Sequence, residues 1–279
     1  MKKPLSSYHP LLYKLRVVQK RLSRTIIWKL SKRNYADKKQ ENKLPYRLIK
    51  HTSKLIRKLG DSDARLQHNK IINLKKAAPY LNHIIIEPNQ YFSFWKLVGR
   101  PTAERGFVEG MELSIGKARA GIGGGLCQIS NLIHWMALHS PLQVIERANH
   151  SFDPFPDDGR ILPFGSGAAL FYNYIDLILF NPTQNTYQLT IYVAEHQLEG
   201  EILCNVASDI KYHVYQKNHR FIKLSDQVVR QNEIWQDVSQ KGQGGKPATF
   251  LNSQKLYANS VRVMYPIADE LITNNSHHG

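Results

Sequence analysis

A cysteine stands at the end of a glycine-rich segment, in a position that suits a nucleophile. Residues 121–128 read Gly-Ile-Gly-Gly-Gly-Leu-Cys-Gln, and the apolar spacing over 128–139 predicts a helix that begins beside Cys127. Unpaired backbone N–H groups at a helix start stabilise an anion, and such placement can lower a cysteine pKa from about 8.5 to roughly 3.5–7.5. The pattern therefore indicates a thiolate nucleophile at Cys127. The alternative interpretation is a small buried cysteine that follows a flexible loop.

The glycines of this segment add a second part to the expected site. Gly123, Gly124 and Gly125 let the backbone approach a substrate closely, and free N–H groups there can stabilise an oxyanion. The segment is not a phosphate-binding P-loop, because no Gly-Lys-Ser or Gly-Lys-Thr follows it. It also lacks the acidic ribose partner of a dinucleotide-binding motif. We therefore expect no nucleotide and no other cofactor.

A cysteine nucleophile needs a general base, and histidine is the usual one. His150 follows a strand that begins at Val144, which makes it the candidate base; a surface or capping histidine is the alternative. An acid that orients the histidine would complete a triad, and Asp153 and Asp176 are the candidates. Asp176 lies in an apolar strand, where a buried carboxylate needs a partner.

Metal binding is not indicated by the remaining histidines and cysteines. His134 and His139 are five positions apart, so one helix face does not present both. The chain has two cysteines, which excludes a disulfide-rich scaffold and a multi-cysteine zinc signature. We predict no metal, and we interpret Cys204 as a structural thiol near a strand end.

The elements that must position these residues predict a mixed α+β fold with antiparallel sheets and the cysteine at a helix N-terminus. Apolar periodicity predicts helices over 9–34, 69–81 and 128–139. Segments 170–180 and 187–193 are expected to be paired strands. The polar residues 35–60 are interpreted as a connector.

The chain is expected to divide into three parts. Residues 1–58 form a basic helical leader, residues 59–204 form the core domain, and residues 205–279 form a β-rich extension with a tail. The leader contains 18 Lys and Arg against two acids, whereas the remainder carries 20 of each sign, so the net charge of +16 belongs to the leader.

The leader helix combines this charge with apolar side chains at helical spacing, namely Leu11, Leu15, Val18, Leu22, Ile26 and Leu30. One interpretation is a helix over 9–34 that lies on an anionic membrane surface. The other is a helix that packs its leucine stripe on the domain. Nucleic-acid binding is disfavoured, because the aromatic interleaving and motif it requires are absent.

No segment reads as an export signal or a transmembrane helix. Lys14, Arg16 and Lys20 interrupt the apolar stretch near the N-terminus, and no run approaches the roughly 20 apolar residues that span a bilayer. We expect a cytoplasmic protein, with a peripheral membrane location as the alternative.

The residues around Cys127 resemble the signature of the VanW family. The segments that carry the likeness are Gly-Gly-Gly-Leu-Cys-Gln-Ile-Ser-Asn-Leu at 123–132, Phe-Ser-Phe-Trp at 92–95, Val-Ile-Glu-Arg at 144–147 before His150, and Ile-Asp-Leu at 175–177. The resemblance runs from about residue 65 to at least 195. The chain is similar to the compact VanW type rather than to its long multidomain relatives.

This resemblance implies a function in the bacterial cell wall and in glycopeptide resistance. Some VanW-domain proteins are regarded as peptidoglycan transpeptidases that join stem peptides through L,D bonds. At the matching positions, the resemblance makes Cys127 the acyl-enzyme nucleophile and His150 the general base. It places the backbone of Gly123–Gly125 in the binding or oxyanion site.

The same resemblance leads us to expect substrate contacts from three further side chains in the matched segments, namely Gln128, Ser130 and Arg147. The expected partner is a peptidoglycan stem peptide or its precursor. The alternative function is a non-catalytic accessory protein that binds the membrane surface or an envelope precursor.

One segment departs from the family pattern. The usual Gly-x-Asp-Ala-Thr is replaced by Gly-Ser-Gly-Ala-Ala at 165–169, so Gly167 stands where the family has an acid. In a triad the orienting acid changes the rate by orders of magnitude. We therefore expect that Asp176 or Asp153 substitutes for it, that the acid is dispensable, or that activity is reduced.

Overall fold

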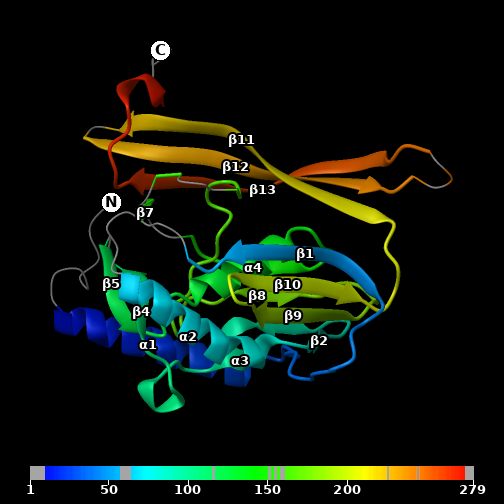
Figure 1. The fold of residues 1–279 in the computed structure, drawn as a ribbon, viewed down its shortest axis with the longest axis horizontal. Coiled ribbons are helices and arrows are strands. Elements are labelled where there is room, and N and C mark those ends of the chain that lie inside the picture. The colour runs from blue at the N-terminus through cyan, green and yellow to red at the C-terminus, as the bar shows by residue number, and fades with distance from the viewer. Residues whose placement is uncertain are drawn as a thin grey trace.

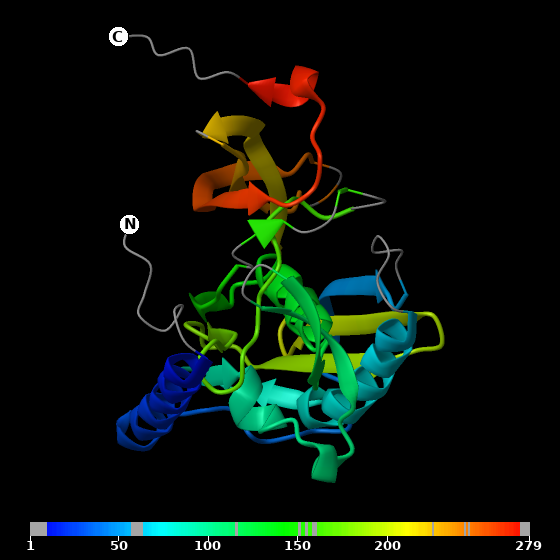
Figure 2. The ribbon, with the colours of Figure 1, turned by 90° about the vertical axis from the view of Figure 1, so that its left-hand side faces the viewer.

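The computed structural model describes residues 10–56, 64–114, 117–149, 152–153, 156–157, 161–224, 226–242, 244 and 246–273. Helices and largely antiparallel sheets are combined in one chain, which confirms the α+β class (Figure 1). Two larger sheets form separate layers, and helix α4 (Cys127–Ala137) lies between them (Figure 2).

The first layer is a four-stranded antiparallel sheet. Its strand order is β1 (Tyr46–Lys54), β10 (Gln197–Cys204), β9 (Tyr187–Val193) and β2 (Ile84–Ile86). Alternate residues of β9 and β10 are apolar and fully buried, as the two-residue period of a strand requires. This buried face carries the main core.

Two helices complete the main core. Helix α2 (Ala64–Leu81) contributes Leu74 and Leu81, both fully buried, and contacts β9. Helix α4 crosses β10 at Gly200, where a Cβ atom would come within 3 Å of Met136 and Leu132. The glycine thus lets the helix approach the sheet closely.

The second layer is built from three long antiparallel strands, β11 (Ile210–Leu224), β12 (Gln227–Gln240) and β13 (Thr249–Val263). The short parallel strands β14 (Ile272–Thr273) and β7 (Phe152–Asp153) lie at its two edges. Helix α4 reaches this layer with Trp135 and Leu138, which pack with Val214 and Ile234. Helix α4 is therefore apolar on two sides because it is covered on two sides.

The remaining elements include the 21-residue helix α1 (Pro10–Leu30) and several short ones. The short elements are helix α3 (Phe94–Val98), the sheet of β3 (Tyr91–Ser93), β8 (Ile178–Phe180) and β6 (Gln143–Glu146), the hairpin of β4 (Glu109–Ser114) and β5 (Lys117–Ile122), and the 3-10 turns Ala103–Arg105 and Asp269–Leu271. Among the described elements, no helix is both long enough and apolar enough to cross a membrane.

Two expectations about strands are wrong. The connector over 35–60 contains β1, which pairs with β10 at the edge of the first layer; its polar side chains alternate outward, so it lacks an apolar run. Segments 170–180 and 187–193 do not pair with each other. Strand β8 pairs with β3 and β6, whereas β9 pairs with β10 and β2. The division into three parts stays a prediction.

A buried ion cluster joins β12 to β7 within the second layer. Arg230 on β12 is 2% exposed. Its guanidinium donates to Asp153 at 3.0 Å and to Asp157 at 2.9 Å, and it lies 4.2 Å from the centre of the Phe164 ring. A buried arginine of this kind is stable only because carboxylates accept its protons.

We expect Arg230→Met to lower the free energy of unfolding by about 3 kcal/mol, because the buried Asp153 carboxylate loses its guanidinium partner. Urea denaturation measures this change. Arg220→Met on β11 is the matched control. Among the described residues the exposed Arg220 donates to Gln231 alone, so the substitution should cost under about 0.5 kcal/mol. Equal effects of the two substitutions would contradict this account.

Candidate functional site

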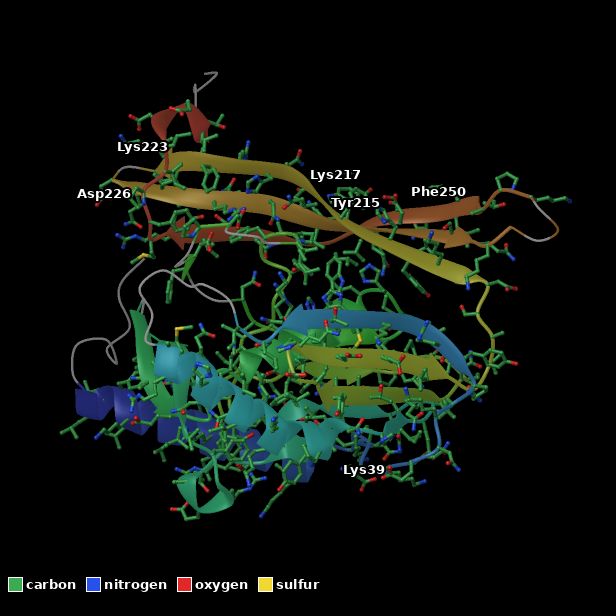
Figure 3. The ribbon with its side chains drawn as sticks, viewed as in Figure 1. Lys39, Tyr215, Lys217, Lys223, Asp226 and Phe250 are labelled. Carbon is green, nitrogen blue, oxygen red and sulfur yellow. The ribbon has the colours of Figure 1, made fainter. Side chains whose placement is uncertain are left out.

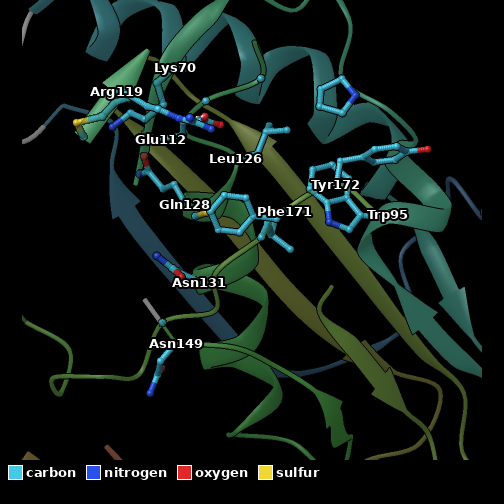
Figure 4. Close-up of a pocket in the computed structure, with 18 of the residues that line it drawn as sticks. Lys70, Trp95, Glu112, Arg119, Leu126, Gln128, Asn131, Asn149, Phe171 and Tyr172 are labelled. Atoms are coloured by element: carbon cyan, nitrogen blue, oxygen red, sulfur yellow. Dashed lines mark hydrogen bonds and ion pairs between the residues drawn. The ribbon is translucent and has the colours of Figure 1, made fainter. Parts of the chain in front are cut away.

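Cys127 opens into a large cavity between α1, α2, the glycine-rich loop and the segment 162–174. The cavity has a volume of about 840 Å³. Figure 4 shows side chains from several elements around it, with Lys70 and Arg119 on one side and Asn131 and Asn149 on another. A cavity of this size with an apolar lining and a few polar groups is typical of a ligand site.

The glycine-rich loop has a conformation that only glycine adopts easily. Gly123 and Gly125 have φ of 78° and 92°. Gly124 lies so close to Gly110 of β4 that a Cβ atom would come within 2.2 Å of its backbone. The buried Asn73 of α2 donates to the Gly124 carbonyl at 2.9 Å. The loop is thus held rigidly from two sides, which places Cys127.

Cys127 is the first residue of α4 and is half-buried with a free thiol. Within the part of the chain that the structure describes, no group accepts a hydrogen bond from the backbone N–H of Gly125 or Leu126. These donors are the ones that a helix start leaves open. The arrangement can bind a carbonyl oxygen or an oxyanion beside the thiol.

The thiol itself differs from the expectation. Burial raises the pKa of Cys127 to about 11, and the Glu112 carboxylate acts in the same direction. A hydrogen bond with the Leu170 backbone acts the other way but is outweighed. The helix start therefore does not lower the pKa here, because removal of the sulfur from water costs the thiolate more than the backbone dipoles return.

Asp176 lies away from the cavity wall. It is 1% exposed and accepts hydrogen bonds from Ser93 Oγ at 2.5 Å, from the Trp95 N–H at 3.1 Å and from the Leu177 N–H at 2.8 Å. These donors fix the start of α3. Burial raises the pKa of Asp176 to about 7. The structure gives this carboxylate a supporting position and does not bring it to the cysteine.

The structure describes the other candidate acid, Asp153, but not the candidate base, His150. Asp153 lines the same cavity as Cys127, but it also accepts hydrogen bonds from Arg230 and from Tyr265 at 3.0 Å. His150 lies outside the described residues. Its neighbour in sequence, Asn149, lines the cavity.

The remaining expected contacts divide between the cavity and its supports. Gln128 lines the cavity, and its amide donates to Ser53 Oγ at 3.0 Å and to the Lys54 carbonyl at 2.8 Å. Ser130 is fully buried and donates to the Ala168 carbonyl at 2.6 Å. Arg147 donates to the Gly167 carbonyl at 2.8 Å. Ser130 and Arg147 thus hold the cavity wall at 165–168 and are not among the residues that line the cavity.

Several lining residues were missed by the sequence analysis. They are the basic side chains Lys70, Arg100 and Arg119, the acid Glu112, and the aromatic residues Trp95, Phe171, Tyr172 and Tyr174. Helix α1 adds Tyr13, Lys14, Val17, Val18 and Arg21. These residues come from separate elements, so no local motif announced them. Among the described residues, no group of three or more His, Cys, Asp or Glu could hold a metal ion.

Comparison with known proteins gives a consistent match. The model of the family described as "VanW like protein" matches residues 69–203. The chain is 27% identical to the vancomycin B-type resistance protein VanW of Enterococcus faecalis, over 97% of each chain. It is 29% identical to the uncharacterized protein YoaR of Bacillus subtilis, over 32% of this chain and 29% of that protein. No solved structure matches the chain.

We expect alkylation of Cys127 by iodoacetamide at pH 7.5 to be at least about a hundredfold slower than that of a free cysteine, because a pKa near 11 leaves little thiolate. The rate should rise about tenfold per pH unit toward pH 11. Glu112→Gln should accelerate it by removing a negative charge, and Glu104→Gln on the exposed surface is the control. A rate that levels off below pH 8.5 would contradict the assigned environment.

Asp176 gives a second prediction, about stability. Its folded pKa is raised to about 7, whereas a carboxyl of an unfolded chain titrates near 4. Its contribution to stability is therefore complete below about pH 4 and is lost as the pH rises through 7. The free energy of unfolding of Asp176→Asn, relative to that of the wild type, should therefore rise by on the order of 3 kcal/mol between pH 4 and pH 8.

Urea denaturation at several pH values measures this difference. Burial lowers the pKa of His134 to about 3, so the contribution of His134 to stability is lost as the pH falls. This effect is common to both proteins and cancels in their difference. Parallel stability curves for the wild type and the Asn variant would show that Asp176 is ionised in the folded protein at neutral pH.

Proposed function

Because the chain belongs to the VanW family, we propose that it is a cysteine-dependent acyl-transferase that acts on peptidoglycan stem peptides, in the manner of an L,D-transpeptidase. The observation that carries this proposal is the Cys127 thiol at the start of α4, facing a cavity beside open backbone N–H groups. The printed name of the Enterococcus relative refers to B-type vancomycin resistance, and we extend that association to this chain as part of the proposal.

The proposed reaction needs a nucleophile, a base and oxyanion donors. The base, which the family resemblance assigns to His150, takes the proton of the Cys127 thiol as the sulfur attacks a peptide carbonyl. The backbone N–H groups of Gly125 and Leu126 donate to the developing oxyanion. The amine of the broken peptide bond leaves with the proton, and a thioester remains. An amine of a second peptide then attacks the thioester and releases the thiol.

The raised pKa of Cys127 defines how this reaction starts. A thiol with a pKa near 11 is ionised in about one molecule in ten thousand at pH 7. The mechanism therefore requires proton transfer together with nucleophilic attack, rather than a thiolate that is present before substrate binds.

The lining of the cavity suits an acidic peptide. Lys70 and Arg100 offer positive charge, whereas Arg119 and the Glu112 carboxylate pair with each other at 2.6 Å. Trp95 contributes an aromatic surface on another side of the cavity (Figure 4). Carboxylates of a stem peptide would pair with the basic groups, and its apolar side chains would contact the aromatic ring.

The position at which the family pattern has an acidic side chain is occupied by Gly167 in this chain. Gly167 lines the cavity, and a Cβ atom there would come within 2.9 Å of Asn131 Oδ1. Asn131 in turn accepts a hydrogen bond from the Ala168 N–H at 2.6 Å. Asp153 is engaged by Arg230, and Asp176 fixes α3. We therefore propose a Cys–His pair without an orienting acid in this chain.

One observation favours a second function, a non-catalytic protein that binds an envelope precursor in the same cavity. The thiol is neutral at physiological pH, and its ionisation is hindered by burial and by Glu112. A binding protein needs only the basic and aromatic lining, and it tolerates a neutral cysteine.

The two functions are separated by a search for the thioester. We expect incubation of the protein with synthetic stem tetrapeptides to give a covalent adduct at Cys127, detected by intact-mass spectrometry and peptide mapping after rapid acid quenching. Cys127→Ala should abolish the adduct. Cys204→Ala should retain it, since Cys204 is 2% exposed and lies at the end of β10.

Calorimetric titration of the same peptides into wild-type protein and Cys127→Ala completes the test. Binding of equal affinity to both, with no adduct on the wild type, would reject the acyl-transferase and support the binding protein. Absence of both binding and adduct would reject stem peptides as the ligand.

A further inference from the structure

Helix α1 contacts the rest of the protein through a mixed face, on which two arginines lie beside Trp28, which packs against the main core. The side chains that are partly buried recur at spacings of three and four residues, and they are Tyr13, Val17, Arg21, Arg24 and Trp28. The opposite side of the helix carries large apolar residues that are exposed to solvent, namely Leu15 (65%), Leu22 (60%), Ile26 (46%) and Leu30 (78%). We call these four residues the apolar stripe. The expectation that the leucines pack on the domain is therefore wrong.

Specific polar contacts fix this orientation. Both terminal N–H groups of the Arg24 guanidinium donate to the Glu146 carboxylate, at 2.6 and 2.5 Å. Arg21 donates to the Tyr172 carbonyl at 2.7 Å and lies over the Tyr172 ring. Lys20 lies over the ring of Tyr174. Rotation of α1 to bury the apolar stripe would break all of these contacts.

The charge of α1 indicates what covers the stripe. The helix contains six Lys and Arg and no acid over Pro10–Leu30. Lys14 and Arg16 are exposed, and on a helical projection they lie on either side of the stripe; Lys29 is exposed near its C-terminal end. An apolar face bordered by positive charge matches an anionic lipid surface, where acyl chains accept the apolar residues and headgroups pair with the cations.

We propose that α1 lies in the plane of an anionic membrane, with the apolar stripe buried below the headgroups and the mixed face still bound to the domain. Figure 2 shows α1 at the periphery of the molecule, where a flat surface can reach it. Since Lys14, Val17 and Arg21 of the same helix line the cavity, docking holds the wall of the cavity beside the bilayer. Docking does not depend on whether Cys127 reacts.

The test is flotation of the full-length protein with vesicles of phosphatidylglycerol and phosphatidylcholine, compared with phosphatidylcholine alone. We expect binding to the anionic vesicles. The triple substitution Leu15→Ser, Leu22→Ser and Ile26→Ser should lower vesicle partitioning at least about tenfold. Its thermal unfolding should be unchanged, because these side chains are exposed in the free protein.

Two further variants make the test specific. Phe250→Ser with Leu251→Ser removes exposed apolar surface (61% and 50%) from β13, in the other layer of the molecule (Figure 3), and should leave vesicle binding unchanged. Lys14→Gln and Arg16→Gln should each lower binding to anionic vesicles about fivefold, corresponding to about 1 kcal/mol per charge.

Three results would overturn the proposal. They are failure of the wild type to bind anionic vesicles, equal binding of the wild type and the triple variant, and equal loss of binding in the Phe250 and Leu251 control. Sedimentation equilibrium without lipid identifies the competing occupant. A dimer that the triple variant abolishes, in a protein that ignores vesicles, would assign the apolar stripe to an interface between two copies of the chain.

Discussion

The contact between the backbones of Gly124 and Gly110 is the constraint on which the site depends. It leaves no space for a Cβ atom on either residue, and Asn73 fixes it from α2 by donating to the carbonyls of Gly124 and Val108. Helix α2, the β4–β5 hairpin and the start of α4 therefore meet at one point. Cys127 follows three residues later, so its position is determined by this contact rather than by the flexibility that a glycine run suggests.

The same close packing determines the chemistry of the thiol. A helix start favours a thiolate by exposed N–H groups, but it does so only where water or a ligand completes the solvation of the sulfur. Around Cys127 the desolvation outweighs the dipoles, and Glu112 adds to it. The cavity thus holds a neutral thiol beside open oxyanion donors. Under the proposed function, that combination suits a nucleophile that is deprotonated during attack. A neutral thiol also reacts slowly with electrophiles, because the thiolate is the nucleophile.

Local features of the fold were predictable, whereas features that need distant partners were not. The apolar spacing of Ile129, Leu132 and Met136 predicts α4. This spacing is present because the helix buries these side chains in the core. The strand β1 escaped notice because an edge strand with polar outer residues has no apolar run. The VanW resemblance located the cysteine and its loop. It did not reveal that Ser130 and Arg147 support the cavity wall or that Asp176 accepts hydrogen bonds from the start of α3, since these roles depend on hydrogen bonds between elements far apart in sequence.

Helix α1 shows most clearly why amphipathicity alone does not determine packing. Its sequence predicts two faces, but it does not say which face the domain will bind. Here the face with Arg21, Arg24 and Trp28 contacts the domain, because the domain offers Glu146, a carbonyl, two tyrosine rings and the edge of the main core at that position. The basic residues of α1 therefore have different roles. Lys20, Arg21 and Arg24 attach the helix to the domain. Lys14, Arg16 and Lys29 are exposed near the apolar stripe, and Lys14 also lines the cavity. In this arrangement the arginines bind the domain and the leucines are exposed to solvent. Such an arrangement is stable only when the exposed apolar face has a partner, or when the polar contacts outweigh the cost of the exposed apolar area. The paired, partly buried geometry of Arg24 and Glu146 supplies the attachment, and the apolar stripe remains available for a surface outside the chain.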